Sequence, residues 1–316
     1  MAIEPSWDAL GGDRPLQVAK RLLLATRPPF MSASALPVLL GTAYGAQHAI
    51  GFAGVEFLLA MAATLLVTAT ANVLNDVYDD ISGTDVQNDS RLHPFTGGSR
   101  FIQNGVMTRH QMARWGATLA GASIVLGLLL TALAGTEILA FGAIGLGLAL
   151  AYSMPPLKLA SRGLGELAVG SAFGVLPVVG AFWLQTGQIT WAAVLISLPV
   201  ACWVVNILLA NEIPDAEADG AAGKRTLAVR LGPAGTHLAY LGVHAAGAVA
   251  AGVAALTGLL PIWAPLVPVA IAVAAPFTTR GLPKVGHPEA MTGGIKFTML
   301  AHNAGTLWLA GCALLA

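Results

Sequence analysis

Residues 57–80 read FLLAMAATLLVTATANVLNDVYDD, an apolar run that ends in a group of acids. The apolar part, residues 57–74, contains no charged side chain. A helix of about 20 mainly apolar residues crosses the roughly 30 Å hydrocarbon core of a bilayer. The stretch therefore predicts a transmembrane helix that carries Asp76, Asp79 and Asp80 beyond its apolar part.

The composition of the whole chain agrees with a membrane protein. Of its 316 residues, 56% are hydrophobic and only 10% are charged, whereas charged residues make up about 25% of a soluble domain. The net charge is zero, so it gives no reason to expect a nucleic-acid partner. Cys202 and Cys312 lie within apolar runs, where a thiol behaves as a small hydrophobe. We expect an integral membrane protein with membrane lipid around it.

Eight further apolar stretches complete the pattern. Together with the first they predict an all-α fold, a bundle of nine transmembrane helices. The predicted spans are 30–46, 57–74, 115–133, 138–152, 164–183, 191–209, 238–256, 262–277 and 297–315. The polar residues 1–27 predict a cytoplasmic lead-in, and residues 28–316 predict a single transmembrane domain.

The basic residues indicate how the bundle is oriented. All sixteen Lys and Arg residues fall in alternate connecting segments, and cytoplasmic loops carry the basic excess in membrane proteins. This predicts a cytoplasmic N-terminus and an outer C-terminus in the cell's inner (plasma) membrane. The two longest cytoplasmic segments, 72–114 and 210–237, hold the acids and predict an active site on the cytoplasmic side.

Both segments contain the same spacing, N-x3-D-x3-D. It begins at Asn72 in the first segment and at Asn211 in the second. Residues at i, i+4 and i+8 share one face of a helix, so each motif presents a ladder of oxygen atoms. Clustered carboxylates need a neutralising cation, and oxygen ligands suit Mg²⁺ bound to substrate phosphates. The predicted Mg²⁺ ligands are Asn72, Asn75, Asp76, Asp79, Asp80, Asn211, Asp215 and Asp219.

Basic residues near the motifs are candidates for binding a diphosphate. Residues 97–100 read GGSR, a turn that offers backbone N–H groups and a guanidinium. The positive-inside rule alone also explains each basic residue. The candidate diphosphate ligands are Arg91, Arg100, Lys158, Arg162 and Lys224, together with the amides Asn72 and Asn211.

These motifs resemble the UbiA-type intramembrane prenyltransferases over nearly the whole chain. Residues 75–79 are similar to the first Asp-rich motif of the family, and residues 211–232 to the second with its trailing stretch. Arg27-Pro28 and residues 94–100, 152–158 and 162–166 further resemble the menaquinone branch. Gly83 stands where the general family pattern has a third Asp, and Asp85 follows, as in that branch. Glu212 departs from it, because the branch often has Asn there.

The resemblance implies Mg²⁺-dependent transfer of a polyprenyl group from a prenyl diphosphate to an aromatic acceptor. The acceptor implied by the menaquinone branch is 1,4-dihydroxy-2-naphthoate. The implied catalytic residues are Asp76, Asp79, Asp215, Asp219 and Lys158, and the ring of Tyr152 is a candidate for stabilising an allylic cation. Two alternatives stay open: the same reaction on a hydroxybenzoate, homogentisate or lipid acceptor, and a cation-coupled secondary transporter. The sequence leaves prenyl length and oligomeric state open.

Overall fold

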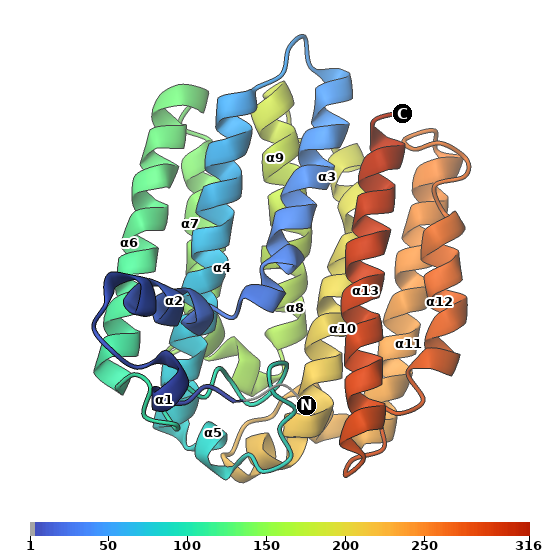
Figure 1. Ribbon diagram of the computed structural model, residues 1–316. Helices are drawn as coiled ribbons and strands as arrows, with labels where there is room; N and C mark the ends of the chain where they lie inside the picture. The colour runs from blue at the N-terminus through green and yellow to red at the C-terminus, as the bar shows by residue number, and fades with distance from the viewer. Residues whose placement is uncertain (1–3) are drawn as a thin grey trace.

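The computed structural model describes residues 4–316, and these contain helices and turns but no β-strand, which confirms the all-α prediction (Figure 1). The chain begins with two short helices beside the bundle and continues into long ones. The helices are α1 Trp7–Leu10, α2 Pro15–Ala25, α3 Ser32–His48, α4 Gly54–Ser82, α5 Thr84–Gln87, α6 Arg109–Ala134, α7 Ile138–Ser153, α8 Gly165–Val169, α9 Leu176–Thr186, α10 Trp191–Ala221, α11 Leu227–Leu256, α12 Leu266–Thr278 and α13 Pro288–Ala313. A π-helical segment, η3 Gly170–Val175, joins α8 to α9.

Every predicted apolar stretch overlaps one of these helices, with α8, η3 and α9 forming one continuous helix. Five helices are long and apolar enough to cross a membrane, or six if the bent pair formed by Pro15–Ala25 and Pro28–His48 counts as one span. α7 and α12 are apolar but shorter. The structure thus confirms an all-helical membrane protein, while nine full spans and their orientation stay predictions.

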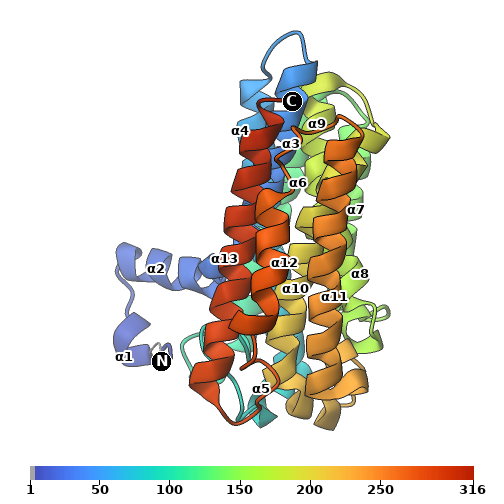
Figure 2. The ribbon, with the colours of Figure 1, turned by 90° about the vertical axis from the view of Figure 1, so that its right-hand side faces the viewer.

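The long helices run side by side, and both acidic motifs lie at the same end of the bundle (Figure 1, Figure 2). α4 and α10 reach this end with their last turns, and α5 and the connection between α5 and α6 gather there (Figure 1). The C-terminus lies at the opposite end. α2 lies outside the bundle and runs crosswise to its long helices (Figure 2).

Glycines allow the central helices to approach closely. A Cβ atom added at Gly41 of α3 would lie 2.1 Å from the backbone oxygen of Val178 in α9, and one at Gly305 of α13 would lie 2.4 Å from the Trp203 ring in α10. Small residues at such crossings let membrane helices associate through tight packing. α3, α9, α10 and α13 therefore form a close-packed centre, and α4, α6 and α7 pack together beside it.

Candidate active site

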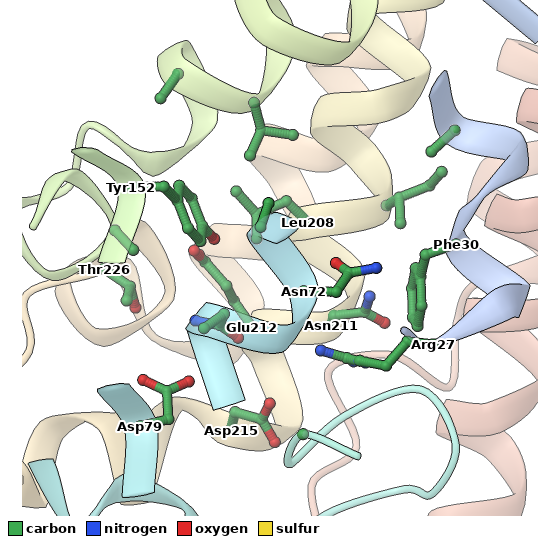
Figure 3. A pocket seen from close by; sticks show the side chains of 18 of the residues that line it. Arg27, Phe30, Asn72, Asp79, Tyr152, Leu208, Asn211, Glu212, Asp215 and Thr226 are labelled. Atoms are coloured by element: carbon green, nitrogen blue, oxygen red, sulfur yellow. The ribbon is translucent and has the colours of Figure 1, made fainter. Parts of the chain in front are cut away.

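A cavity of about 200 Å³ lies between α3, α4, α7, α8, η3 and α10, next to the acidic ends of α4 and α10. Its walls change character along its length (Figure 3). At one end it is lined by Asp79 and Asp215, and further along by Tyr152 and Leu208 (Figure 3). The polar lining residues from both N-x3-D-x3-D segments are Asn72, Asn75, Asp79, Asn211, Glu212, Asp215 and Asp219, and Lys224 joins them.

The two acidic motifs meet across one ammonium group. Lys224 Nζ lies 2.7 Å from Asp79 Oδ1 on α4 and 2.9 Å from Asp219 Oδ1 on α10. The Lys224 side chain is 12% exposed, and those of Asp79 and Asp219 are 18% and 8% exposed. The carboxylates are thus largely removed from water and share one cation. Sequence spacing placed them on two separate ladders, and the fold brings the ladders together.

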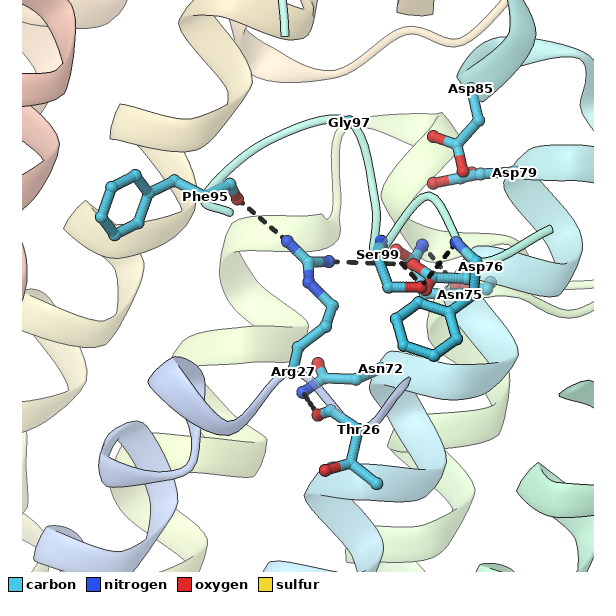
Figure 4. A network of polar contacts seen from close by, with 12 residues as sticks. Thr26, Arg27, Asn72, Asn75, Asp76, Asp79, Asp85, Phe95, Gly97 and Ser99 are labelled. Carbon is cyan, nitrogen blue, oxygen red and sulfur yellow. Dashed lines mark hydrogen bonds and ion pairs between the residues drawn. The ribbon is translucent and has the colours of Figure 1, made fainter. Parts of the chain in front are cut away.

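The loop that contains residues 97–100 covers this end of the cavity. The backbone N–H of Gly97 donates to Asp215 Oδ2 at 3.2 Å, and that of Ser99 donates to Asp76 Oδ2 at 3.1 Å (Figure 4). Asn88 Nδ2 donates to the other Asp215 oxygen at 2.6 Å. The GGSR turn therefore contacts carboxylates of both motifs through backbone N–H groups and fixes their orientation.

Gly98 is held so tightly in this loop that a methyl group there is expected to destabilise the protein. Its φ is +73°, and an added Cβ would lie 2.7 Å from Asp85 Oδ2 and 3.0 Å from Asp76 Oδ1. We expect Gly98→Ala to lower the free energy of unfolding by more than the roughly 1–2 kcal/mol that an L-residue costs in the left-handed conformation. Turnover should fall as well.

Gly105→Ala is the matched control for this prediction. Gly105 has φ +66°, but nothing lies within 4 Å of its added Cβ. Gly105→Ala therefore has the backbone strain but no steric clash, so thermal unfolding of both variants separates the effect of the strain from that of the clash. Equal losses of stability in the two variants would mean that the carboxylates tolerate a side chain at Gly98.

Arg27 is a cavity residue that the sequence placed only among the cytoplasmic basic residues. Its Nη2 donates to the Phe95 carbonyl at 2.9 Å, its Nη1 lies 4.0 Å from Asp76 Oδ1, and its guanidinium lies 4.7 Å from the centre of the Phe30 ring (Figure 4). The side chain lines the cavity. The resemblance of Arg27-Pro28 to the menaquinone branch was the sequence signal that could have pointed to Arg27 as a site residue.

The cavity carries an excess of negative charge. Five acids and two basic residues line it. Burial, together with the charges of Asp79, Asp76 and Asp215, raises the pKa of the cavity residue Asp85 to about 9. Burial alone would lower the pKa of Lys224, but the charges of Asp79 and Asp219 outweigh it and raise that pKa above its usual value. A further cation would relieve this repulsion.

The donor set fits a hard cation such as Mg²⁺. Within residues 4–316, no three Asp, Glu, His or Cys side chains already converge into a metal-binding group, and the Lys224 ammonium lies between Asp79 and Asp219. Buried oxygens without a hydrogen-bond partner include Asp76 Oδ1 and Asn211 Oδ1. Carboxylate and amide oxygens are the ligands that Mg²⁺ accepts, usually together with substrate phosphates.

Several predicted site residues do not line the cavity. Asp80 binds Arg109 at 2.5 Å and Gln103 at 3.1 Å, and Asp76 is buried behind the GGSR loop. The basic candidates Arg91, Arg100, Lys158 and Arg162 also lie outside the lining. Arg91 binds Glu4 at 2.8 Å, Arg100 donates to the Asp85 carbonyl, Arg162 donates to the Pro156 carbonyl at 2.8 Å, and Lys158 is exposed.

Solved structures share the fold at low sequence identity. A UbiA homolog from Archaeoglobus fulgidus bound to DMAPP and Mg²⁺ superposes with a TM-score of 0.65 and 16% identity, covering 92% of this chain and 99% of that one. A structure described as digeranylgeranylglyceryl phosphate synthase gives a TM-score of 0.62 at 17% identity, over 94% of this chain and 99% of its own.

Curated relatives agree in sequence. The 1,4-dihydroxy-2-naphthoate octaprenyltransferase of Mycobacterium tuberculosis is 31% identical over 80% of this chain and 82% of its own length. The Bacillus subtilis protein of the same name is 30% identical over 66% of this chain, and the match spans 65% of its length. A model of the UbiA prenyltransferase family matches residues 34–285. With both acidic motifs facing one cavity, the chain belongs to the UbiA prenyltransferase family.

Proposed function

We propose that this protein transfers a polyprenyl group from a prenyl diphosphate to an aromatic acceptor in a Mg²⁺-dependent reaction. One observation carries the proposal. Asp79 and Asp219, from two motifs far apart in the sequence, both contact the Lys224 ammonium at the polar end of a cavity whose other end is apolar. Such a cavity accommodates a molecule with a charged head and a hydrocarbon tail.

The polar end of the cavity suits the diphosphate. Asp79, Asp215 and Asp219, with the Asn211 amide, are the residues that would hold Mg²⁺, which supplies Lewis-acid stabilisation of a departing diphosphate. Asp76 orients the GGSR loop against this group through the Ser99 N–H. Lys224 and Arg27 are the basic residues that line the cavity, and they would donate hydrogen bonds to the phosphate oxygens and neutralise part of their charge.

The apolar part of the cavity suits the reacting carbon and the acceptor. Tyr152 lines the wall between the acids and the apolar side chains (Figure 3), where its ring stabilises an allylic cation. The surrounding side chains, such as Leu148, Phe173 and Val204, exclude water that would otherwise capture this cation. The acceptor ring then approaches from the same apolar compartment.

The proposed acceptor is 1,4-dihydroxy-2-naphthoate, in menaquinone biosynthesis. This assignment rests on the curated relatives that carry that name at about 30% identity and on residues 94–100, 152–158 and 162–166, which resemble the menaquinone branch. A hydroxybenzoate, a homogentisate or a lipid is the alternative acceptor. The family membership supports the enzyme rather than the cation-coupled transporter.

We propose nine transmembrane helices with a cytoplasmic N-terminus in the inner membrane. The support is the one-sided distribution of Lys and Arg and the position of both acidic motifs at one end of the bundle. Reporter fusions after α9 and after α10 test the orientation, because the proposal puts the first point outside and the second in the cytoplasm. The same side for both fusions, or the reverse arrangement, would contradict it.

The proposed reaction is tested with purified protein in nanodiscs. We expect prenyl diphosphate, Mg²⁺ and 1,4-dihydroxy-2-naphthoate to give a prenylated product by mass spectrometry, and removal of divalent cations with EDTA to abolish it. Excess Mg²⁺ should restore it. Product from another aromatic acceptor alone would keep the reaction and change the substrate. No product from any acceptor, or undiminished turnover in EDTA, would contradict the proposal.

A further inference from the structure

Helix α2 leaves the direction of the bundle, and none of the residues Pro15–Ala25 lines the cavity described above. The chain bends by 49° between this helix and Pro28–His48, and α2 runs crosswise to the long helices (Figure 2). Its C-terminal end packs against the bundle, where Leu22 and Ala25 join a hydrophobic cluster formed with α4 and α6. The rest of α2 extends away from the bundle (Figure 2).

α2 joins the bundle at the depth where two predicted membrane spans end. Asn72 Nδ2 of α4 donates to the Thr26 carbonyl at 2.9 Å, and Trp115 Nε1 of α6 donates to the Leu22 carbonyl at 3.1 Å. Trp115 is the first residue of one predicted span, and Asn72 lies in the last turn of another. Tryptophan is enriched at this depth, where hydrocarbon meets lipid headgroups. The position is that of a helix in the membrane interface.

Contacts with α1 show which face of α2 is turned towards the acidic end of the bundle. α1 lies nearer to that end than α2 does (Figure 1, Figure 2). Arg21 Nη1 donates to the carbonyls of Leu10 and Gly12 at 3.3 Å each, and the guanidinium lies 5.5 Å from the centre of the Trp7 ring. The Arg21 face of α2 therefore points towards α1 and the acidic end.

The opposite face of α2 is apolar and exposed. Leu16, Ala19 and Leu23 lie roughly 140–160° around the helix from Arg21, at about 100° per residue. Leu16 is 81% exposed and Leu23 is 61% exposed, and Ala19 is exposed as well. A helix face in water usually carries polar side chains. An apolar face that is turned away from the acidic end, at the depth of the headgroups, instead suits the hydrocarbon of the adjoining leaflet.

The charges of α2 also suit a lipid surface. Residues 14–25 contain Arg14, Lys20 and Arg21 but no acid. Lys20 is exposed beside the apolar face, and a lysine there covers apolar surface with its stem while its ammonium reaches the headgroups. Anionic lipids attract basic residues on helices of this kind. Apolar face and charge thus match the same partner, the bilayer.

The segment that contains α1 and α2 contacts the active-site loop on both sides. After α2, Arg27 lines the cavity and donates to the Phe95 carbonyl at 2.9 Å. Before α1, Glu4 accepts from Arg91 Nε at 2.8 Å and from Asn104 Nδ2 at 3.2 Å. These three loop residues flank the GGSR turn that covers the acids. Whatever fixes α2 therefore also restrains this loop.

We propose that α2 is an interfacial anchor. Its Leu16, Ala19 and Leu23 face inserts into the leaflet at the acidic end of the bundle, and this insertion holds Arg27 and the GGSR loop in place over the cavity. The partner is the lipid bilayer itself, with its anionic headgroups beside Lys20. The inference depends neither on which side of the membrane the acidic end faces nor on the identity of the acceptor.

Spin-label accessibility in nanodiscs of phosphatidylethanolamine and phosphatidylglycerol tests the insertion. Single labels are attached to Leu16→Cys, Leu23→Cys and Asp8→Cys after Cys202 and Cys312 are replaced by alanine. We expect the labels on α2 to collide more often with oxygen, which concentrates in hydrocarbon, than with a water-soluble nickel chelate. The label at position 8, which is exposed on α1, should show the reverse preference.

Hydrogen exchange of the full chain in the same nanodiscs tests the link to the site. We expect Leu16→Glu/Leu23→Glu to speed amide exchange in residues 15–31 roughly tenfold, as a loss of about 1.4 kcal/mol in the free energy of opening gives. Exchange in the loop 91–104 should rise with it. Ala9→Glu/Gln17→Glu is the matched control, because it adds the same two charges at exposed positions on α1 and about 40° around α2 from Arg21. The control should change exchange less than about twofold.

The other occupants of this face give different results. A preference for the nickel chelate at both leucine positions would place the face in water and overturn the anchor. Shielding from both reagents would also overturn it, and dipolar broadening between the labels of two chains would then assign the face to a second copy of this chain. Faster exchange in residues 15–31 with an unchanged loop 91–104 would overturn the link between the anchor and the active site.

Discussion

Asp79→Asn is expected to lower kcat/KM for prenyl transfer roughly a hundredfold or more, the size of effect seen when one electrostatic partner of a transition state is removed. Asp79 lines the cavity and faces Asp219 across the Lys224 ammonium. Asparagine keeps the shape and one oxygen but removes the charge that a Mg²⁺ ligand supplies. Steady-state kinetics in nanodiscs with varied Mg²⁺ measures the effect, and the Mg²⁺ concentration for half-maximal rate should rise.

Asp80→Asn is the matched control for this variant. Asp80 is the next residue of α4 and was also a predicted Mg²⁺ ligand, but its carboxylate binds Arg109 and Gln103 outside the cavity. The Arg109 side chain is 55% exposed, and such pairs contribute about 0–1 kcal/mol to stability. We expect Asp80→Asn to keep turnover within a few fold. Comparable losses in the two variants would mean that the acids bind metal as a group.

The difference between Asp79 and Asp80 marks how far the sequence predicts this site. The spacing predicted two oxygen ladders, and both acidic motifs lie at one end of the bundle, but Asp76 and Asp80 do not line the cavity. Successive residues of a helix point about 100° apart, so one of two adjacent acids must leave the cavity. Which one leaves depends on how α4 is rotated against α6 and α7, and this follows from packing between distant segments.

The acidic helices continue past their apolar runs, as the spacing of the motifs predicted, but the groups that hold their last turns were beyond the sequence pattern. The predicted spans end at residues 74 and 209, where the apolar runs end, whereas α4 continues to Ser82 and α10 to Ala221. Polar turns normally suggest a loop, but here Gly97, Ser99, Asn88 and Lys224 supply hydrogen bonds to the acids of those turns. These partners come from other parts of the chain, so no local sequence pattern predicts these hydrogen bonds.

The basic residues illustrate a similar limit. Arg91, Arg100, Arg162 and Lys224 all belong to the segments that the charge pattern predicts to be cytoplasmic, and the pattern gives each the same weight. In the structure Arg91, Arg100 and Arg162 bind nearby loop groups. Lys224 alone of these four lines the cavity. Its position follows from the turn between α10 and α11, which directs it back towards Asp219 and Asp79.

Lys224→Met is expected to affect turnover and stability in a distinctive way. Methionine retains an apolar stem of similar length but leaves Asp79 and Asp219 without their shared cation. Removing one partner from a buried ion pair costs about 3–5 kcal/mol, so we expect the metal-free variant to unfold at a lower temperature than the unmodified protein. Turnover should fall roughly a hundredfold, because the lost charge no longer stabilises the departing diphosphate.

Magnesium distinguishes this role from a purely structural one. In the unmodified protein a bound metal ion would compete with the ammonium for the same carboxylates, whereas in Lys224→Met this competitor is absent. Added Mg²⁺ without diphosphate should therefore raise the unfolding temperature more in the variant than in the unmodified protein. Lys158→Met is the control, since Lys158 is exposed at the same end of the bundle and lines no part of the cavity. It should alter neither turnover nor the response to Mg²⁺. A large loss of turnover in Lys158→Met with little change in Lys224→Met would reverse the assignment and place the diphosphate beside Lys158.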